Sequence, residues 1–149
     1  MSNQEPAVKP LNVSDVRNRL SDVFTDAVMR HRPVPIARGG KELGVLLGIE
    51  EIARLVEGIS FEPEVFQDAG IVSVWLSEFQ FYGRGKDLAA ARIDLLDEVR
   101  DYVVEYLEEI ESYGAAPNRR THFSHVIKAL PADLSGHLDS VIFDDRPTT

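Results

Sequence analysis

Residues 32–47 of the sequence read RPVPIARGGKELGVLL. Apolar residues alternate on both sides of the glycine pair Gly39–Gly40: Val34 and Ile36 before it, and Leu43, Val45 and Leu47 after it. Two glycines between two alternating runs are typical of a β-hairpin, because the turn needs positive φ at both of its central positions. This stretch therefore predicts a hairpin near the front of the chain.

The segments on either side of the hairpin show helical spacing. Apolar residues recur from Val16 to Val28, and Ser14 stands where an N-cap is expected. The pattern predicts a mobile arm over residues 1–10, a short strand near 11–13 and a helix over about 15–30 that Pro33 ends. After the hairpin, a short helix is expected over 49–57, ended by Gly58. Residues 1–59 should therefore form one α/β unit.

The rest of the chain predicts a second unit over residues 60–143. Strands are expected over 61–67 and 71–76, followed by a loop over 77–86 and a long helix from Asp87 to about Ser112. One face of this helix is apolar and the other carries many carboxylates. Shorter helices are predicted over 118–130 and 133–143, and residues 144–149 are expected to be a disordered tail. The predicted fold class is α+β, with a β-hairpin packed on a long amphipathic helix and a helical C-terminus.

The charge is distributed unevenly along the 149 residues, whose formal net charge is −9. Residues 1–49 carry seven basic and five acidic side chains, a net +2, whereas residues 60–113 carry four basic and thirteen acidic ones, a net −9. The front can therefore face an anion while the second half faces a cation. The chain has no cysteine, which excludes disulfides, thiolate nucleophiles and zinc sites built on sulfur, and fits a reducing compartment.

No group of residues has the spacing of a catalytic site. Gly83 and Gly85 lack the further glycine and the lysine of a phosphate-binding loop. His122 and His125 could share a helix face, but they have no carboxylate at ligand spacing, so solvated or interface histidines are the favoured interpretation over a metal site. We therefore expect no enzyme, metal or cofactor. No segment is apolar for long enough to cross a bilayer, and the N-terminus lacks a signal-peptide core, which predicts a cytoplasmic protein.

The basic residues of the front are candidate anion contacts. Arg17 is expected in the first turn of its helix, where the helix dipole disfavours a cation and a bound phosphate would offset that cost. Arg38 and Lys41 flank the predicted hairpin turn. Ordinary surface charges are the alternative, because a net +2 gives only a weak field. A dimer would double that field and match the two-fold symmetry of palindromic DNA.

Three stretches of the front resemble the Phd/YefM family of type II antitoxins. They are VSDVRNRLSD at 13–22, RPVPIARGGK at 32–41 and VLLGIEEI at 45–52. The resemblance implies a dimer whose paired front units bind operator DNA, with the family's DNA-contacting arginines at Arg17 and Arg38. Arg19 replaces the usual asparagine, and Gly39 stands where many members have a second arginine. The expected DNA-binding residues are Lys9, Ser14, Arg17, Arg19, Arg38 and Lys41.

The second half resembles a HicB-like antitoxin domain. The resemblance lies in VWLSEF at 74–79 and YGRGKDL at 82–88 before an acidic helix. The run APNRR at 116–120 is similar to Phd-like antitoxins whose partner is a RelE-like toxin. Such toxins are basic because they bind RNA, so carboxylates and exposed aromatic rings would suit them. The expected toxin-binding residues are Phe79, Phe81, Tyr82, Glu98, Glu105, Glu108 and Glu109. Trp75 is expected in the core of its domain, and Tyr102 and Tyr106 in the core or a dimer seam.

Three functions follow from these observations. The first is an antitoxin that neutralises a basic RelE- or HicA-like ribonuclease toxin by direct binding and represses its own operon as a homodimer or higher oligomer. The second is a stand-alone DNA-binding regulator without a toxin, whose second half oligomerises or senses a ligand. The third is a nuclease, because HicB-like domains resemble a partial ribonuclease-H fold; its weakness is that the acidic residues lie along a helix rather than meeting at strand ends.

Overall fold

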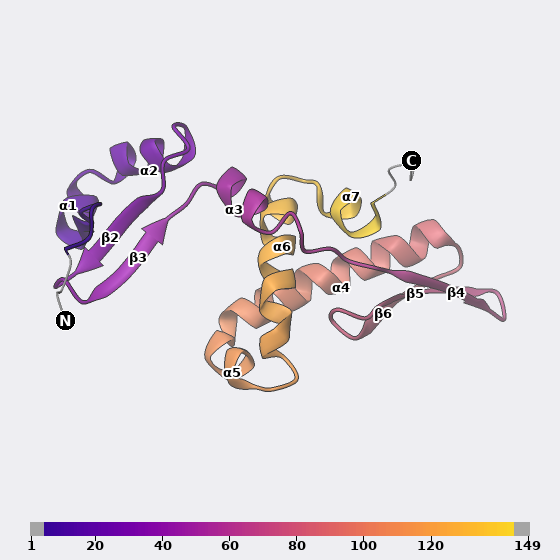
Figure 1. Ribbon diagram of the computed structural model, residues 1–149. Coiled ribbons are helices and arrows are strands. Elements are labelled where there is room, and N and C mark those ends of the chain that lie inside the picture. The colour runs from indigo at the N-terminus through magenta and orange to yellow at the C-terminus, as the bar shows by residue number, and fades with distance from the viewer. Residues whose placement is uncertain (1–4, 145–149) are drawn as a thin grey trace. The chain divides into compact units, whose positions relative to one another are not determined.

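The computed structural model describes residues 5–144. The chain divides into two compact units, the front unit (Met1–Arg54) and the rear unit (Leu55–Thr149), each of which has its own sheet (Figure 1). Both units mix helices and strands, as the predicted α+β class requires.

A three-stranded sheet with order β1-β2-β3 organises the front unit. β1 (Leu11–Asn12) pairs in parallel with β2 (Val34–Arg38), which pairs antiparallel with β3 (Glu42–Leu46). Gly39 and Gly40 turn between β2 and β3 with φ of 59° and 69°, which confirms the predicted hairpin. The helices of this part are α1 (Val13–Asn18), α2 (Leu20–Val28) and α3 (Ile49–Leu55).

The helix predicted over 15–30 is in fact two helices. Arg19 leaves helical geometry with φ of −129° and ψ of 33°, and its N–H bonds back to the carbonyls of Asp15 and Val16. The prediction of Ser14 as N-cap is also wrong: the side chain of Asn12 caps α1 and accepts a bond from the Ser14 N–H at 3.1 Å. The chain enters the helix directly from β1, so the cap falls two residues earlier than the apolar spacing indicated.

The rear unit has an antiparallel sheet with order β4-β5-β6. Its strands are β4 (Glu64–Asp68), β5 (Ile71–Leu76) and β6 (Phe81–Gly85), and α4 (Leu88–Glu108) packs against β5 and β6. The prediction of a loop over 77–86 is wrong for its second half, because Phe81–Gly85 forms β6. A Cβ at Gly83 would lie 2.5 Å from the Ala91 carbonyl oxygen, so this glycine permits close strand–helix packing.

Four short helical segments follow α4. They are α5 (Ile110–Ala115), a 3₁₀ turn (Arg120–His122), α6 (Phe123–Leu134) and α7 (Leu138–Phe143). The long helix predicted to Ser112 stops at Glu108 because Glu109 departs from helical geometry, with φ of −106° and ψ of 28°. Pro131, outside both predicted C-terminal helices, lies inside α6. The predicted disordered tail lies outside the described residues, except for Asp144.

The core of the rear unit lies between α4, the sheet and α6–α7. Val72, Val74 and Leu76 of β5 point into it, as the alternation predicts. The predicted apolar stripe of α4 is buried at its centre: Ala91, Leu95, Val99, Tyr102, Val103 and Tyr106. Leu88, Leu107 and Ile110 share the apolar spacing of the helix predicted to Ser112 but are exposed at the two ends of the stripe, and Ile110 belongs to α5.

Candidate functional site

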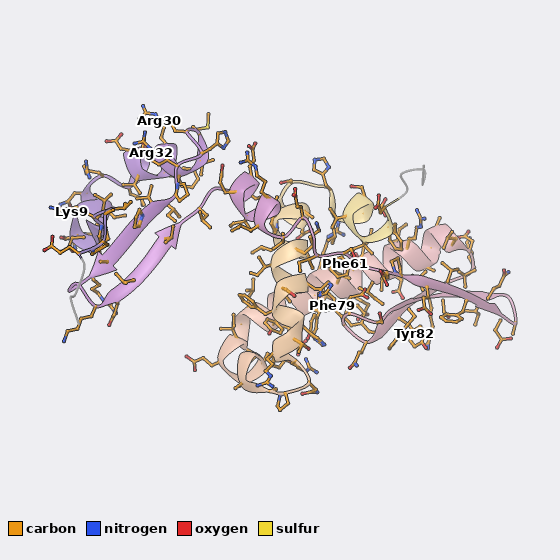
Figure 2. The ribbon with its side chains drawn as sticks, viewed as in Figure 1. Lys9, Arg30, Arg32, Phe61, Phe79 and Tyr82 are labelled. Atoms are coloured by element: carbon orange, nitrogen blue, oxygen red, sulfur yellow. The ribbon has the colours of Figure 1, made fainter. Side chains whose placement is uncertain are left out.

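Four predicted DNA-binding side chains of the front unit carry unpaired charges. Lys9, Arg17, Arg19 and Lys41 are all exposed, and within residues 5–144 none of them makes a side-chain hydrogen bond or ion pair. Figure 2 labels Lys9 close to α1. These side chains are free to contact an anion.

Arg17 lies in the last turn of α1, not in the first. The end of a helix favours a cation, because the unpaired carbonyls there carry partial negative charge. The argument that a bound phosphate would offset a cost at Arg17 is therefore wrong. Ser14 is exposed as well, and its hydroxyl is bonded to Asn12 Oδ1 at 3.2 Å.

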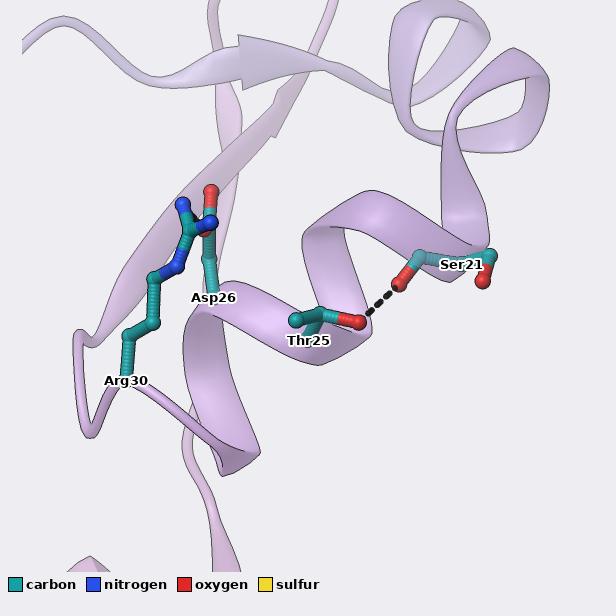
Figure 3. Close-up of polar contacts among 4 residues, drawn as sticks. All are labelled: Ser21, Thr25, Asp26 and Arg30. Carbon is teal, nitrogen blue, oxygen red and sulfur yellow. Dashed lines mark hydrogen bonds and ion pairs between the residues drawn. The ribbon is translucent and has the colours of Figure 1, made fainter.

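Arg38 and Arg30 are already paired with carboxylates. Arg38 lies opposite Glu42 in the hairpin register, and its Nε donates to Glu42 Oε2 at 2.6 Å. Arg30 pairs with Asp26 at 2.9 Å along α2, beside the Thr25 hydroxyl that donates to the Ser21 carbonyl (Figure 3). Exposed pairs of this kind contribute about 0–1 kcal/mol, so an incoming phosphate can displace the carboxylate, but the local field is weaker than the arginines alone suggest.

Apolar side chains cover part of the front unit's surface. Leu20, Phe24, Leu43 and Val45 are each more than half exposed. Leu20 and Phe24 belong to the apolar repeat that predicts the helix, and Leu43 and Val45 to the alternation that predicts the strand, yet none of the four is buried within the unit. These exposed apolar groups make this surface a candidate for contact with another molecule.

A cavity of about 300 Å³ lies in the rear unit among α4, the β5–β6 connection and the segment between α5 and α6. Glu98, Asp101 and Glu105 reach it from α4, where spacings of three and four residues place them on one face. None of the three forms an ion pair within the described residues, although Glu105 Oε1 accepts a bond from the Tyr113 hydroxyl at 2.7 Å. The cavity is therefore negatively charged along one wall.

Aromatic rings and one arginine form the rest of the cavity. Phe81 and Tyr102 line it, and the Arg119 guanidinium packs over the rings of Tyr113 at 4.3 Å and Tyr102 at 5.7 Å. Tyr106 holds the backbone of this segment, because its hydroxyl donates to the Arg119 carbonyl at 3.0 Å. The cavity thus combines carboxylates with faces that attract cations.

His122 lies at the back of the same cavity and is only 7% exposed. Its Nδ1 is 2.5 Å from the Tyr102 hydroxyl. Burial lowers the pKa of His122, and the nearby Arg119 and His125 lower it further. Burial also raises the pKa of Tyr102. Both groups are therefore neutral near pH 7. The expectation of a solvated or interface histidine is wrong for His122, while His125 bonds the Ser60 carbonyl at 2.9 Å.

The predicted toxin-binding residues divide between the cavity and other surfaces. Phe79, Phe81, Glu98 and Glu105 line the cavity. The expectation that Phe79 is exposed is wrong: it is 4% exposed and packs on Phe61 and Tyr102, with ring centroids 5.5 Å and 4.8 Å away. The two glycines of β6 do not leave this ring uncovered, because the tight turn after β5 folds it into the core. Figure 2 shows Phe61 and Phe79 beside each other.

Tyr82 lies on the opposite face of the sheet. It pairs in register with Trp75, and the two rings are in contact at a tilt, with their centroids 4.5 Å apart. Trp75 therefore does not belong to the core, contrary to expectation. Phe81, the neighbour of Tyr82, is half-buried, also contrary to expectation. Glu108 and Glu109 are exposed at the end of α4, outside the lining of the cavity.

Six lining residues of the cavity were not predicted as site residues, among them Asp101, Arg119 and His122. Asp101 could have been found, because it lies three residues after Glu98 on a predicted helix. Arg119 and His122 follow Pro117, where no periodicity fixes the path of the chain. Only the fold brings these two residues to α4.

Within residues 5–144, no group of three or more His, Asp or Glu side chains is arranged to hold a metal ion. Over the same residues, no helix combines the length and the apolar character needed to span a bilayer.

Comparisons with known proteins complete the description of the site. Residues 8–142 match the model of a PHD-like family described as "Antitoxin of toxin-antitoxin, RelE / RelB, TA system". The fold is similar to a crystal structure from Syntrophomonas wolfei subsp. wolfei of an antitoxin part of a proposed toxin/antitoxin system, with a TM-score of 0.74, 20% identity, and coverage of 91% of this chain and 97% of that one. No match was found among curated proteins.

Proposed function

The chain belongs to the PHD-like family of toxin–antitoxin antitoxins, and from this premise we propose that it neutralises a basic ribonuclease toxin of RelE or HicA type by direct binding. In this proposal the rear unit covers the toxin's RNA-binding surface, and no covalent chemistry is involved. The front unit dimerises and binds operator DNA, which represses the operon.

The separation of charge is the observation that carries this proposal. The unpaired cations Lys9, Arg17 and Arg19 are in the front unit, while Glu98, Asp101 and Glu105 share one cavity of the rear unit. Opposite charge on two partners accelerates their encounter and excludes wrong partners. A polyanion suits the first set of residues, and a cationic protein suits the second.

The exposed apolar side chains support the dimer. Val23, Ala27 and Val34 are the only residues of the described front unit that form a buried core cluster. So small a core does not stabilise an independent domain, whereas a second copy could cover Phe24, Leu43 and Val45. A dimer would also double the weak positive field and supply two-fold symmetry for DNA.

Co-expression with the product of the adjacent gene tests the proposal, provided that this product is a small basic protein. We expect that protein to arrest growth alone, to co-purify with this chain and to be relieved by it. We also expect the complex or the free chain to retard a DNA fragment from its own promoter. A neighbour that is harmless, or toxic without being bound and relieved, contradicts the antitoxin proposal; DNA binding without any toxin supports the stand-alone regulator instead.

A further inference from the structure

We propose that the cavity of the rear unit is a receptor for a single arginine side chain, and that the toxin inserts this arginine when it binds. The inference rests on the proposed function for the identity of the partner. The cavity itself can be tested without a toxin. Its volume of about 300 Å³ is at the lower end of the range for ligand sites, which suits one long side chain better than a cofactor.

The charges lining the cavity favour a cation. Glu98, Asp101 and Glu105 stand against the single positive charge of Arg119, which leaves the cavity with a net −2. Arg119 does not form an ion pair with any of them within the described residues, because its guanidinium lies over the Tyr113 ring. A second guanidinium can therefore pair with Glu98 and Asp101 without displacing an existing bond.

His122 supplies an independent reason to expect an occupant. More than nine-tenths of this side chain is buried, it lines the cavity, and only its Nδ1 has a hydrogen-bond partner within the described residues. When Nδ1–H donates to Tyr102 Oη, Nε2 is an acceptor without a donor. This nitrogen keeps some accessible surface, so a guanidinium N–H in the cavity can donate to it in place of water.

The aromatic walls favour arginine over lysine. Arg119 shows that a planar guanidinium packs at this end of the cavity, 4.3 Å from the centre of the Tyr113 ring. A guanidinium stacks on rings and binds carboxylates through two parallel bonds, whereas an ammonium is compact and strongly hydrated. Tyr102 is nearly buried under neighbouring rings and Arg119, so the half-buried Phe81 is the ring that lines the cavity beside the carboxylates.

An NMR titration of the full chain tests the cavity alone. The probe is N-acetyl-L-arginine amide, and the uncharged N-acetyl-L-citrulline amide is its matched control. We expect saturable shifts of the Tyr102 and His122 resonances with the arginine probe in the millimolar range. The double variant Glu98→Gln, Asp101→Asn should lose them, and Glu64→Gln, Glu111→Gln, which removes two exposed charges elsewhere in the rear unit, should keep them.

The same variants distinguish a failure of the arginine-receptor proposal from a failure of the proposed antitoxin function. All four side chains are exposed and unpaired within the described residues, so both variants should retain the wild-type circular dichroism spectrum. Equal shifts with citrulline, no saturable shift with arginine, or equal responses of the two variants overturn the receptor. Saturable arginine binding without a toxin that binds the chain leaves the receptor intact and overturns the antitoxin function.

A measurement with the toxin tests the occupant. We expect the cavity variant to bind the toxin at least about tenfold more weakly than the control variant, mainly through faster dissociation. Equal weakening of both variants would mean that the carboxylates act only through long-range attraction, and would overturn insertion of an arginine. In that case the wild-type chain would still bind the toxin, and the antitoxin function would stand.

Discussion

The two units of the chain differ in how completely they bury their apolar side chains. Within the described residues, the rear unit has one continuous core that joins β5, α4, α6 and α7, and its larger members Leu76, Leu95 and Tyr106 have no exposed surface. The core cluster of the front unit contains Val23, Ala27 and Val34 alone, and larger apolar residues stay on its surface. The rear unit therefore has a substantial core of its own, although apolar side chains such as Phe66, Ile71 and Phe123 stay exposed, whereas the buried core of the front unit is very small.

This difference indicates which unit depends on other molecules for its stability. A fold of about fifty residues buries a small share of its surface and is marginally stable, so a disulfide, a metal or a second chain would add to its stability. The chain has no cysteine, so the front unit has a second chain as its simplest source of stability. The rear unit needs no such help and can offer a preformed surface to a partner.

Leu95→Ala should have the largest effect on stability. It tests whether the rear unit is stabilised by its own core. Leu95 has no exposed surface and packs at the centre of α4, so its truncation leaves a cavity. We expect a loss of about 2–5 kcal/mol in the free energy of unfolding, measured by urea denaturation followed through Trp75 fluorescence. Ile93→Ala, on an exposed position of the same helix, should change it by less than about 0.5 kcal/mol.

Val45→Asp tests the dependence of the front unit on a second copy. Val45 is exposed on the edge strand β3, so the charge costs little in a monomer but would be buried without a partner in a dimer. We expect the association constant from analytical ultracentrifugation to fall by at least about a hundredfold, with loss of operator binding. Val65→Asp, on the exposed edge strand β4 of the rear unit, is the matched control. Unchanged association in Val45→Asp would contradict a dimer through the front unit.

The sequence predicted well those elements whose signals are local. The Gly39–Gly40 hairpin, the alternation of Val72, Val74 and Leu76 and the cap at Asp87 all depend on residues close together in the chain. Errors arose where tertiary packing decides. Phe81–Gly85 was predicted as a loop because Gly83 and Gly85 disfavour strands, but α4 packs so closely on β6 that only glycine fits at these positions.

The candidate site was predicted only in part, because some of its residues have local sequence signals and others depend on tertiary packing. Helical spacing identified Glu98 and Glu105 on one face of α4, and the structure places both at the cavity. Phe79 was expected on the surface because Gly83 and Gly85 follow it, but it is buried, whereas Leu20 fits the apolar repeat of its helix and is exposed. Burial depends on what covers a residue, which the local pattern does not contain.

Arg17→Ala tests whether a positive charge of the front unit contributes to DNA binding and not to toxin binding. Arg17 is exposed and unpaired within the described residues, so its loss should leave folding unchanged. We expect operator binding to weaken by about 1–3 kcal/mol per site if the arginine contacts a base, or the salt dependence to become shallower if it contacts a phosphate. Toxin affinity should not change. Fluorescence anisotropy at several salt concentrations measures the first effect, and calorimetry with the toxin measures the second; equal losses in both would indicate unfolding.

The pH dependence of stability should come partly from His122 in the rear unit. Its pKa in the folded chain lies below its value of about 6.5 in the unfolded chain, so the unfolded chain binds more protons between the two values. The stability that neutral His122 provides is therefore complete above about pH 6.5 and falls as the pH drops through this window, by at most about 1.4 kcal/mol per pH unit. The other charged or titratable groups around the His122 imidazole are His125, Arg119 and the carboxylates of the cavity.

Urea denaturation of two histidine variants isolates this contribution. His122→Gln can keep a hydrogen bond to Tyr102 and should flatten the pH dependence over that window. His137→Gln, at an exposed position before α7, should keep the wild-type slope. Identical slopes for the wild type and His122→Gln would assign the pH dependence to other groups.

Glu42→Gln should have the smallest effect, and it is a gain. Glu42 neutralises Arg38 across the β2–β3 hairpin, and the side chains of both are mostly exposed. Since such a pair contributes at most about 1 kcal/mol, its removal should cost the hairpin little and should strengthen operator binding by no more than about fivefold at low salt. The double variant Arg38→Ala, Glu42→Gln is the control. If Glu42→Gln strengthens DNA binding only while Arg38 is present, Arg38 contacts the DNA; an equal gain without Arg38 would mean that Glu42 acts only through general repulsion, and would remove Arg38 from the DNA-binding surface.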